Sequence, residues 1–287
     1  MKTIIMVAAL MLSGLLVGGA NAQGPIEQEG ALTNTLAPAP AVELRLTRGR
    51  SAVFDLRNLP QTPPLRRERP EREAPEIDRI ALPGAQPAPT PLAPLAMAPA
   101  PAPLANFAGL DFSTWGAGHP PDTNGDVGPV YYIQSINSSI GIYRKSDGAQ
   151  IAAFTLDTFM SQGNFGNLCD TDNFGDPVIL YDTFEDRWVI TDFAFQVDGG
   201  GNVVNPPGAF ECIAVSKSGD PVSGGWNFYS INTAGGLGDY PKFGIWTDGI
   251  YMSVNMFGYA SGGAFQDRVC MPSTRPRCTR ASQACRW

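Results

Sequence analysis

The stretch VYYIQSINSSIGIYRKSDGAQIAAF at residues 130–154 decides the fold class. β-Branched and aromatic residues dominate 130–137, 140–144 and 150–154, and Ser-Asp-Gly at 146–148 supplies a turn before the last of them. Such short runs joined by tight turns are typical of antiparallel hairpins. The stretch therefore predicts consecutive strands of one sheet.

The same pattern recurs through residues 106–266. Further β-rich runs, separated by Gly, Asp and Pro turns, occupy 178–181, 187–193, 212–216, 226–229, 242–246 and 250–255. The 32 Gly and 26 Pro among 287 residues argue against long helices. We expect an all-β domain, with a sandwich, a barrel and a propeller as the possible architectures.

Two of the predicted hairpins resemble each other. The run GDPVILYD at 175–182 is followed by Trp188, and the run GDYPKFGIW at 238–246 is followed by Tyr251. An aromatic residue thus recurs at a similar offset after each Pro-led strand. Internal repetition of this kind favours a propeller over a sandwich.

Three motifs in this order resemble a group of secreted bacterial β-propellers related to the sialidase-like superfold. The motifs are PPDTNGDVGP at 120–129, Asp176-Pro177 with Arg187-Trp188, and the segment from Ala214 to Trp226. The resemblance covers about residues 109–266 and implies four-stranded blades of about 40–50 residues. Residues 106–266 supply about three to four blades, so we expect an incomplete propeller.

The chain divides into four segments. Residues 1–22 have Lys2, an apolar run and Ala20-Asn21-Ala22, which predicts a signal peptide. An uncleaved anchor is the alternative, but the run is shorter than the ~20 residues of a membrane span. We expect secretion to the extracellular space or the periplasm, and no membrane span after cleavage.

Residues 23–105 are rich in Pro and Ala, which predicts a disordered linker, a pro-region or a stalk ahead of the domain at 106–266. Residues 267–287 then change abruptly to Arg and Cys without alternation. A shifted reading frame over 269–278 permits a strand-like sequence, so we interpret this tail as a frameshift or a truncation. A genuine basic arm is the alternative.

Charge excludes some functions. The 20 Lys and Arg stand against 27 Asp and Glu, giving a net charge of −7, whereas a nucleic-acid-binding protein is expected to be basic. A single His excludes zinc sites built from several imidazoles.

Two acidic loops are candidate calcium sites. Asp122, Asn124 and Asp126 alternate as oxygen ligands of a hard cation do, but Val127 and Ile133 replace the Gly and Glu of an EF-hand. An Asx-rich turn is the alternative. A second cluster, Asp170, Asp172 and Asp176, is either another Ca²⁺ site, a carboxyl pair with a raised pKa, or turn chemistry.

Cys169 and Cys212 precede the tail, and export to an oxidising compartment predicts that they form a disulfide. The tail adds Cys270, Cys278 and Cys285, an odd number that fits an unselected sequence.

We expect a binding or scaffold module without an assignable catalytic site, whose partner is an extracellular glycan or protein. The alternative is a secreted carbohydrate-active hydrolase, sialidase-like or another glycosidase, that uses paired carboxylates. A sialidase is expected to hold its substrate carboxylate with three arginines, and residues 106–266 contain two, Arg144 and Arg187. Convergence of two carboxylates and an exposed Trp on one concave face would favour the hydrolase.

Overall fold

The computed structural model describes residues 46–65, 102–233, 235–260, 263–274, 277–278 and 285–286. All of them belong to one compact unit, Glu43–Trp287. The predicted signal peptide and most of the predicted linker lie outside the described residues. Within the described part, no helix has the length and apolar character needed to cross a membrane.

The described elements are mostly strands. In chain order the strands are β1 (Leu46–Ala52), β2 (Asn124–Val127), β3 (Tyr131–Ile136), β4 (Ser139–Arg144), β5 (Gln150–Thr155), β6 (Asn173–Asp182), β7 (Arg187–Ala194), β8 (Phe210–Ser216), β9 (Trp226–Asn232), β10 (Leu237–Trp246), β11 (Gly249–Phe257), β12 (Phe265–Thr274), β13 (Arg277–Cys278) and β14 (Cys285–Arg286). The helices are short: α1 (Phe112–Trp115), α2 (Leu156–Met160), and the 3₁₀ turns η1 (Leu56–Asn58), η2 (Ser161–Gly163) and η3 (Leu168–Asp170).

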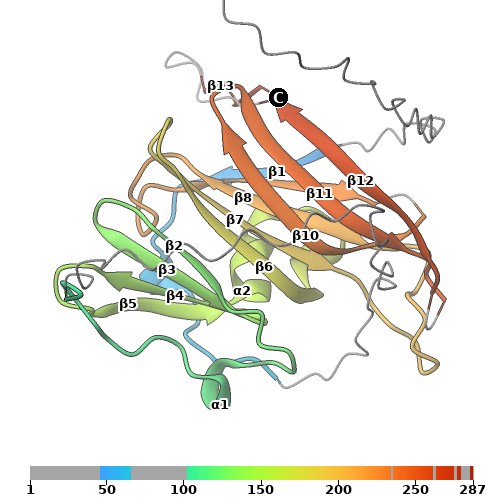
Figure 1. Ribbon diagram of the computed structural model, residues 1–287, viewed down its shortest axis with the longest axis horizontal. Coiled ribbons are helices and arrows are strands. Elements are labelled where there is room, and N and C mark those ends of the chain that lie inside the picture. Colours follow the sequence, from blue (N-terminus) through green and yellow to red (C-terminus); the bar gives the residue numbers. More distant parts are fainter. Residues whose placement is uncertain are drawn as a thin grey trace, which may run out of the picture. The chain divides into compact units, whose positions relative to one another are not determined.

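Antiparallel meanders build the sheets (Figure 1). The first sheet has the order β2-β3-β4-β5, the middle sheet β1-β9-β8-β7-β6, and the third sheet β10-β11-β12, while β13 and β14 form a separate pair. The edge strand β6 of the middle sheet contacts both β2 of the first sheet and β10 of the third sheet. The prediction of an all-β fold made of antiparallel hairpins is confirmed.

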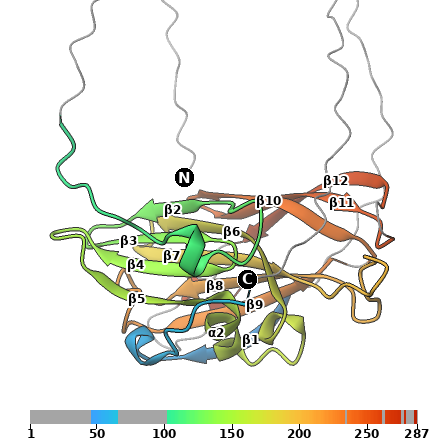
Figure 2. The same ribbon diagram turned by 90° about the horizontal axis from the view of Figure 1, so that it is seen from below.

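The middle sheet is buried on both faces. Figures 1 and 2 show the first sheet on one side of it and the third sheet on the other. Trp188 and Ile190 pack toward the first sheet and α2, whereas the intervening Val189 packs toward the third sheet. Because successive strand residues point to opposite faces, a sheet covered twice needs nearly continuous apolar strands, as in β7 and β8.

Each strand predicted between 130 and 255 is present. Their positions could be predicted because one or both faces of each strand are covered, and covered faces require a regular pattern of apolar residues. Five strands were not predicted, and three of them, β12, β13 and β14, belong wholly or partly to the tail at 267–287. β2 was interpreted as a loop because its sequence, Asn-Gly-Asp-Val, has low β-propensity, and β1 fell inside the predicted linker.

Residues 46–65 correct the expectation of a linker without structure. β1 pairs antiparallel with β9 and so extends the middle sheet, with Leu46 opposite Ile231. Leu56 is fully buried, and its N–H donates to the Val222 carbonyl at 2.9 Å. The Gln61 side chain accepts from the Ala153 N–H of the first sheet at 2.5 Å. The high proline content of residues 23–105 predicted a disordered linker. In the described segment, however, the prolines follow β1 and do not interrupt the strand.

The domain boundary expected at residue 266 falls inside a strand. β12 pairs with β11 from Phe265 to Thr274, with Cys270 opposite Ser253. The origin of the Arg- and Cys-rich tail in a frameshift stays a prediction.

Candidate functional site: a pocket beside helix α2

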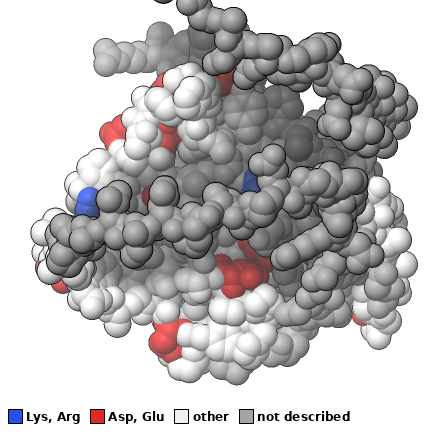
Figure 3. All heavy atoms as spheres, in the orientation of Figure 1, with Lys and Arg blue, Asp and Glu red and all other residues white. Residues whose placement is uncertain are grey.

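A pocket of about 220 Å³ opens where the first sheet, α2 and the start of β6 meet. Its described walls come from residues 62–65, 117–119, 137–138 and 173–174, together with the side of α2. On the face drawn in Figure 3, acidic atoms are visible near the centre, in the region where Figure 1 shows α2. Asp157 is the only carboxylate among the described lining residues.

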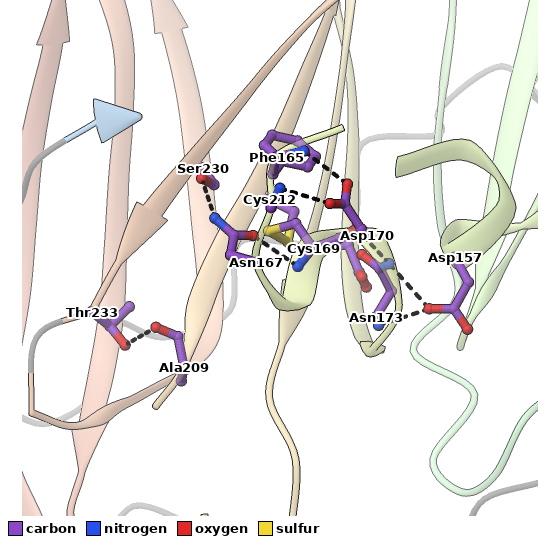
Figure 4. Close-up of a disulfide and its surroundings, with 12 residues drawn as sticks. Asp157, Phe165, Asn167, Cys169, Asp170, Asn173, Ala209, Cys212, Ser230 and Thr233 are labelled. Atoms are coloured by element: carbon purple, nitrogen blue, oxygen red, sulfur yellow. Dashed lines mark hydrogen bonds between the residues drawn. A yellow bond between two sulfur atoms is a disulfide. The ribbon is translucent and has the colours of Figure 1, made fainter. Parts of the chain in front are cut away.

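Asp157 is held in place by Asn173. Thr155 caps α2 by accepting from the Thr158 N–H, which places Asp157 in the first turn. Asp157 Oδ1 accepts from the Asn173 backbone N–H at 2.8 Å and from Asn173 Nδ2 at 3.1 Å (Figure 4). Asn173 Nδ2 also donates to the Cys169 carbonyl at 3.0 Å. The amide orientation is thus fixed by two acceptors, and the carboxylate has a defined direction.

Asn137 connects the segments that form another wall of the pocket. It lies in the turn between β3 and β4, and its Nδ2 donates to the Pro120 carbonyl at 2.9 Å and to Asp122. Its Oδ1 accepts from the Asp176 N–H at 2.9 Å. Gly175 packs so closely on this amide that an added Cβ would lie 2.5 Å from Oδ1, and its φ is +137°. Only glycine suits that position.

The remaining walls are apolar with polar tips. Pro63, Pro64 and Phe174 contribute apolar surface, and Ser138 and Thr158 contribute hydroxyls. His119 also lines the pocket, with its ring 4.6 Å from that of Phe112. A few polar groups set among apolar walls are typical of small-ligand pockets.

A buried acid lies behind Asp157. Asp192 on β7 is fully buried, and its Oδ1 accepts from the Gly175 N–H at 3.1 Å. Burial, with the nearby charges of Asp157, Glu211 and Asp176, raises the pKa of Asp192 well above its usual value.

The first predicted calcium cluster joins two sheets. Asn124 Oδ1 accepts from the Ile179 N–H at 2.8 Å, and Asp126 Oδ2 accepts from the Tyr181 N–H at 2.7 Å. Both side chains lie on β2, and both amides belong to β6. Asp122 lies apart from this bridge, at the Asn137 amide.

The second predicted cluster does not come together as one site. Asp170 accepts from the Phe165 and Gly166 N–H groups (Figure 4). Asp172 accepts from Gln196 Nε2 at 3.1 Å, and Asp176 accepts from the Tyr240 N–H at 3.1 Å. In the part of the chain that the structure describes, no three His, Cys, Asp or Glu side chains are grouped so as to hold a metal ion. Calcium binding stays a prediction.

The predicted disulfide is confirmed. Cys169 in η3 is bonded to Cys212 on β8, with a Cα–Cα distance of 5.7 Å (Figure 4). It anchors η3, which carries Asp170 and lies just before Asn173 of β6, to β8 of the middle sheet. In the chain-entropy model a bridge with a sequence separation of 43 is worth about 4 kcal/mol.

The tryptophans do not line the described pocket. Trp188 and Trp226 are fully buried, and Trp115 packs against Leu110 and Ile136. Trp246 is 63% exposed but contacts Phe184 at the turn ends of β6 and β10, whereas the pocket lies at the start of β6. The convergence of carboxylates with an exposed Trp that would favour a hydrolase is not found among the described residues.

Sequence reasoning missed Asp157, Asn137, Asn173 and Asp192. Asp157 carried a usable signal, because Thr155 followed by an acid in the first turn is typical of a helix start. The other three lie at strand ends or within a strand, where nothing in the local pattern separates them from turn residues.

No family model, curated protein or solved structure matches this chain.

Proposed function

We propose that this chain is an exported binding or scaffold module whose three sheets are blades of an incomplete propeller. Two features support the blade arrangement: the strands of each sheet, apart from β1, follow one another as an antiparallel meander, and β2 and β10 both contact β6. The disulfide and the predicted signal peptide support export.

We place ligand binding in the pocket beside α2. The observation that carries this proposal is Asp157, a carboxylate oriented by Asn173 at a cavity of about 220 Å³ that has apolar walls. Such a carboxylate accepts hydrogen bonds from hydroxyl or amine donors, and the proline and phenylalanine walls suit the carbon face of a small ring. An extracellular glycan has this combination of groups.

A binding experiment tests the proposal. The mature chain, residues 23–287, is applied to an immobilised panel of microbial and host oligosaccharides. We expect at least one to bind, and Asp157→Asn to weaken that binding by about 10- to 100-fold, since a hydrogen bond to a charged group is worth about 1.5–3 kcal/mol.

Asp248→Asn is the matched control, because Asp248 lies on the distant β10–β11 turn and accepts from the Tyr251 hydroxyl. Equal binding by both variants and the parent protein would show that the pocket is not the binding site.

A glycoside hydrolase is the second candidate function, and the proximity of Asp157 to Asp192 is the observation that favours it. Hydrolysis of a glycosidic bond uses one carboxylate and one carboxyl of raised pKa. Asp192 is fully buried, so this function requires the floor of the pocket to open. Turnover of nitrophenyl glycosides that Asp157→Asn abolishes would establish it.

A further inference from the structure

Glu211 is a buried acid that lies outside the pocket. It occupies β8, a central strand of the middle sheet, opposite Phe193 on β7 and Ile231 on β9. It is fully buried, and neither carboxyl oxygen has a hydrogen-bond partner in the described part of the chain. A buried carboxylate without partners costs several kcal/mol, so the group needs neutralising.

The alternation of strand residues directs Glu211 toward the third sheet. Phe193 and Ile231, its cross-strand neighbours, pack in the clusters on the third-sheet side, whereas the adjacent Cys212 packs on the opposite side. Gly238 on β10 lies against it, since an added Cβ there would be 3.0 Å from Glu211 Oε1. Glu211 therefore occupies the contact between β8 and the start of β10.

Other acids face this contact. Asp176 Oδ2 and Asp239 Oδ1 both accept from the single Tyr240 N–H, at 3.1 and 2.8 Å, so β6 and β10 each bring a carboxylate to the same place. Both residues are at least nine-tenths buried. On the other face of the middle sheet, Asp157 of α2 faces Asp192. The charged groups near Glu211 are thus Asp176 of β6 and Asp239 of β10, which raise its pKa, and Asp192 of β7, whose own pKa Glu211 raises.

The closed environment limits what can neutralise Glu211. Its oxygens are inaccessible to water, and the described residues form no group that could hold a metal ion. A proton can neutralise a single carboxylate without any further ligand. Burial, reinforced by Asp176 and Asp239, raises the pKa of Glu211 well above its usual value, in agreement with this geometry.

We propose that Glu211 is a proton-binding group that couples the contact between the middle and third sheets to pH. In the folded protein it holds a proton, which permits Gly238 to pack against it. Loss of that proton as pH rises creates an unpaired charge, and the start of β10 moves away from β8 so that water reaches the carboxylate.

The sign of the pH dependence follows from linkage. Below about pH 4 both the folded and the unfolded chain bind this proton, and no difference arises. Above it the unfolded chain releases the proton while the folded chain retains it, so the contribution of Glu211 to stability falls as pH rises toward its folded pKa. One proton changes the unfolding equilibrium constant about tenfold per pH unit in that window.

Urea unfolding of the parent protein and Glu211→Gln at a series of pH values tests the coupling. The ratio of the two unfolding constants is expected to change about tenfold per pH unit above pH 4, with the variant gaining relative to the parent as pH rises. The test compares how the ratio changes with pH and not the absolute stability, because the buried Gln amide also lacks hydrogen-bond partners and destabilises the variant at every pH. Ile231→Val is the control, since Ile231 lies opposite Glu211 on β9 and has no titratable group, so its ratio should stay flat.

Two further measurements are made on folded protein. At pH 6 the infrared carbonyl absorption of protonated carboxylic acids should be stronger in the parent protein than in Glu211→Gln, because Asp192 contributes to both, and this difference should disappear as pH rises. Hydrogen exchange of the parent protein at 237–240, corrected for intrinsic rates, should accelerate over the same range. A flat ratio together with no difference in carboxylic-acid absorption would overturn the proposal. So would protection of β10 by added Ca²⁺ in the parent but not in Glu211→Gln, because a metal ion would then be the neutralising cation.

Discussion

Single polar side chains, not a continuous strand ladder, join the first sheet to the middle sheet. Asn124 and Asp126 on β2 reach across to the Ile179 and Tyr181 amides of β6. Asn137 makes a third link through the Asp176 amide. The Asn124 and Asp126 side chains replace backbone acceptors that β2 would have offered if β2 and β6 paired directly.

This arrangement is a further structure that the Asp-x-Asn-x-Asp pattern permits, besides a calcium loop and an Asx-rich turn. Oxygen side chains at alternate positions suit a loop that wraps a cation, but alternate positions also lie on one face of a strand. Sequence spacing does not distinguish the two arrangements. The structure places Asn124 and Asp126 on the strand, with β6 amides as their partners.

Removing one of these links should cost stability. Asp126→Ala leaves the Tyr181 N–H without its acceptor, which should lower the free energy of unfolding by about 1–3 kcal/mol. Urea denaturation followed by circular dichroism measures the loss, first with a chelator and then with excess Ca²⁺. Asp126→Asn retains an acceptor oxygen and should lose less.

A Ca²⁺-dependent stabilisation that disappears in Asp126→Ala would instead assign a metal to this residue. Unchanged stability of Asp126→Ala under both conditions would contradict the bridging role.

At the scale of the elements, the middle sheet organises the fold. Its strands carry apolar residues on both faces, so it packs against α2 and the first sheet on one side and against β11 on the other. The hairpins β6–β7 and β10–β11 resemble each other, because each has a proline in its first strand and an aromatic residue in its second. Trp188 lies opposite Tyr181 in the first hairpin, and Tyr251 lies opposite Gly244 in the second. The two aromatics have opposite environments, because only the first is covered by another sheet.

Two tryptophans lie beside the turns of these hairpins, Trp188 at the start of β7 and Trp246 at the end of β10, and they should differ in their contribution to stability. Trp188 is fully buried, and its Nε1 donates to the Gly219 carbonyl at 3.2 Å, whereas Trp246 is 63% exposed. Trp188→Ala should cost about 3–5 kcal/mol and Trp246→Ala no more than about 0.5 kcal/mol. Circular dichroism in urea measures both, and equal losses would contradict the covered position of β7.

The accuracy of the strand predictions follows from the same burial. Runs such as β3, β7 and β11 have at least one covered face, so their apolar alternation is strong enough to read directly. β1 depends on a partner distant in the chain, β9, and β2, although it pairs with the adjacent β3, is linked by its side chains to the distant β6. The pocket was beyond prediction for the same reason, since its walls come from segments between 62 and 174. The disulfide was predictable because, ahead of the tail, the chain offers one pair of cysteines.

At the scale of the whole molecule, a segment from the Pro-rich N-terminal region completes the domain. β1 covers the edge of β9, Leu56 fills the core beside Phe154 and Phe228, and Gln61 binds the first sheet. Residues 62–65 then form one wall of the pocket. The segment 46–65 thus connects the middle sheet, the first sheet and the candidate site.

Truncation tests this role. A chain that begins at Glu43 should fold like the mature protein, because it keeps β1 and η1. A chain that begins at Arg66 leaves β9 as an uncovered edge and removes Leu56, whose loss alone is comparable to a Leu→Ala change of about 2–5 kcal/mol. We expect it to aggregate during size-exclusion chromatography.

A synthetic peptide of residues 43–65 should restore a monomeric elution volume, since it supplies the missing strand, Leu56 and Gln61 together, whereas the same peptide with Leu56→Ala should restore less. Monomeric behaviour of the shorter chain without the peptide, with an unchanged urea midpoint, would show that the segment is dispensable.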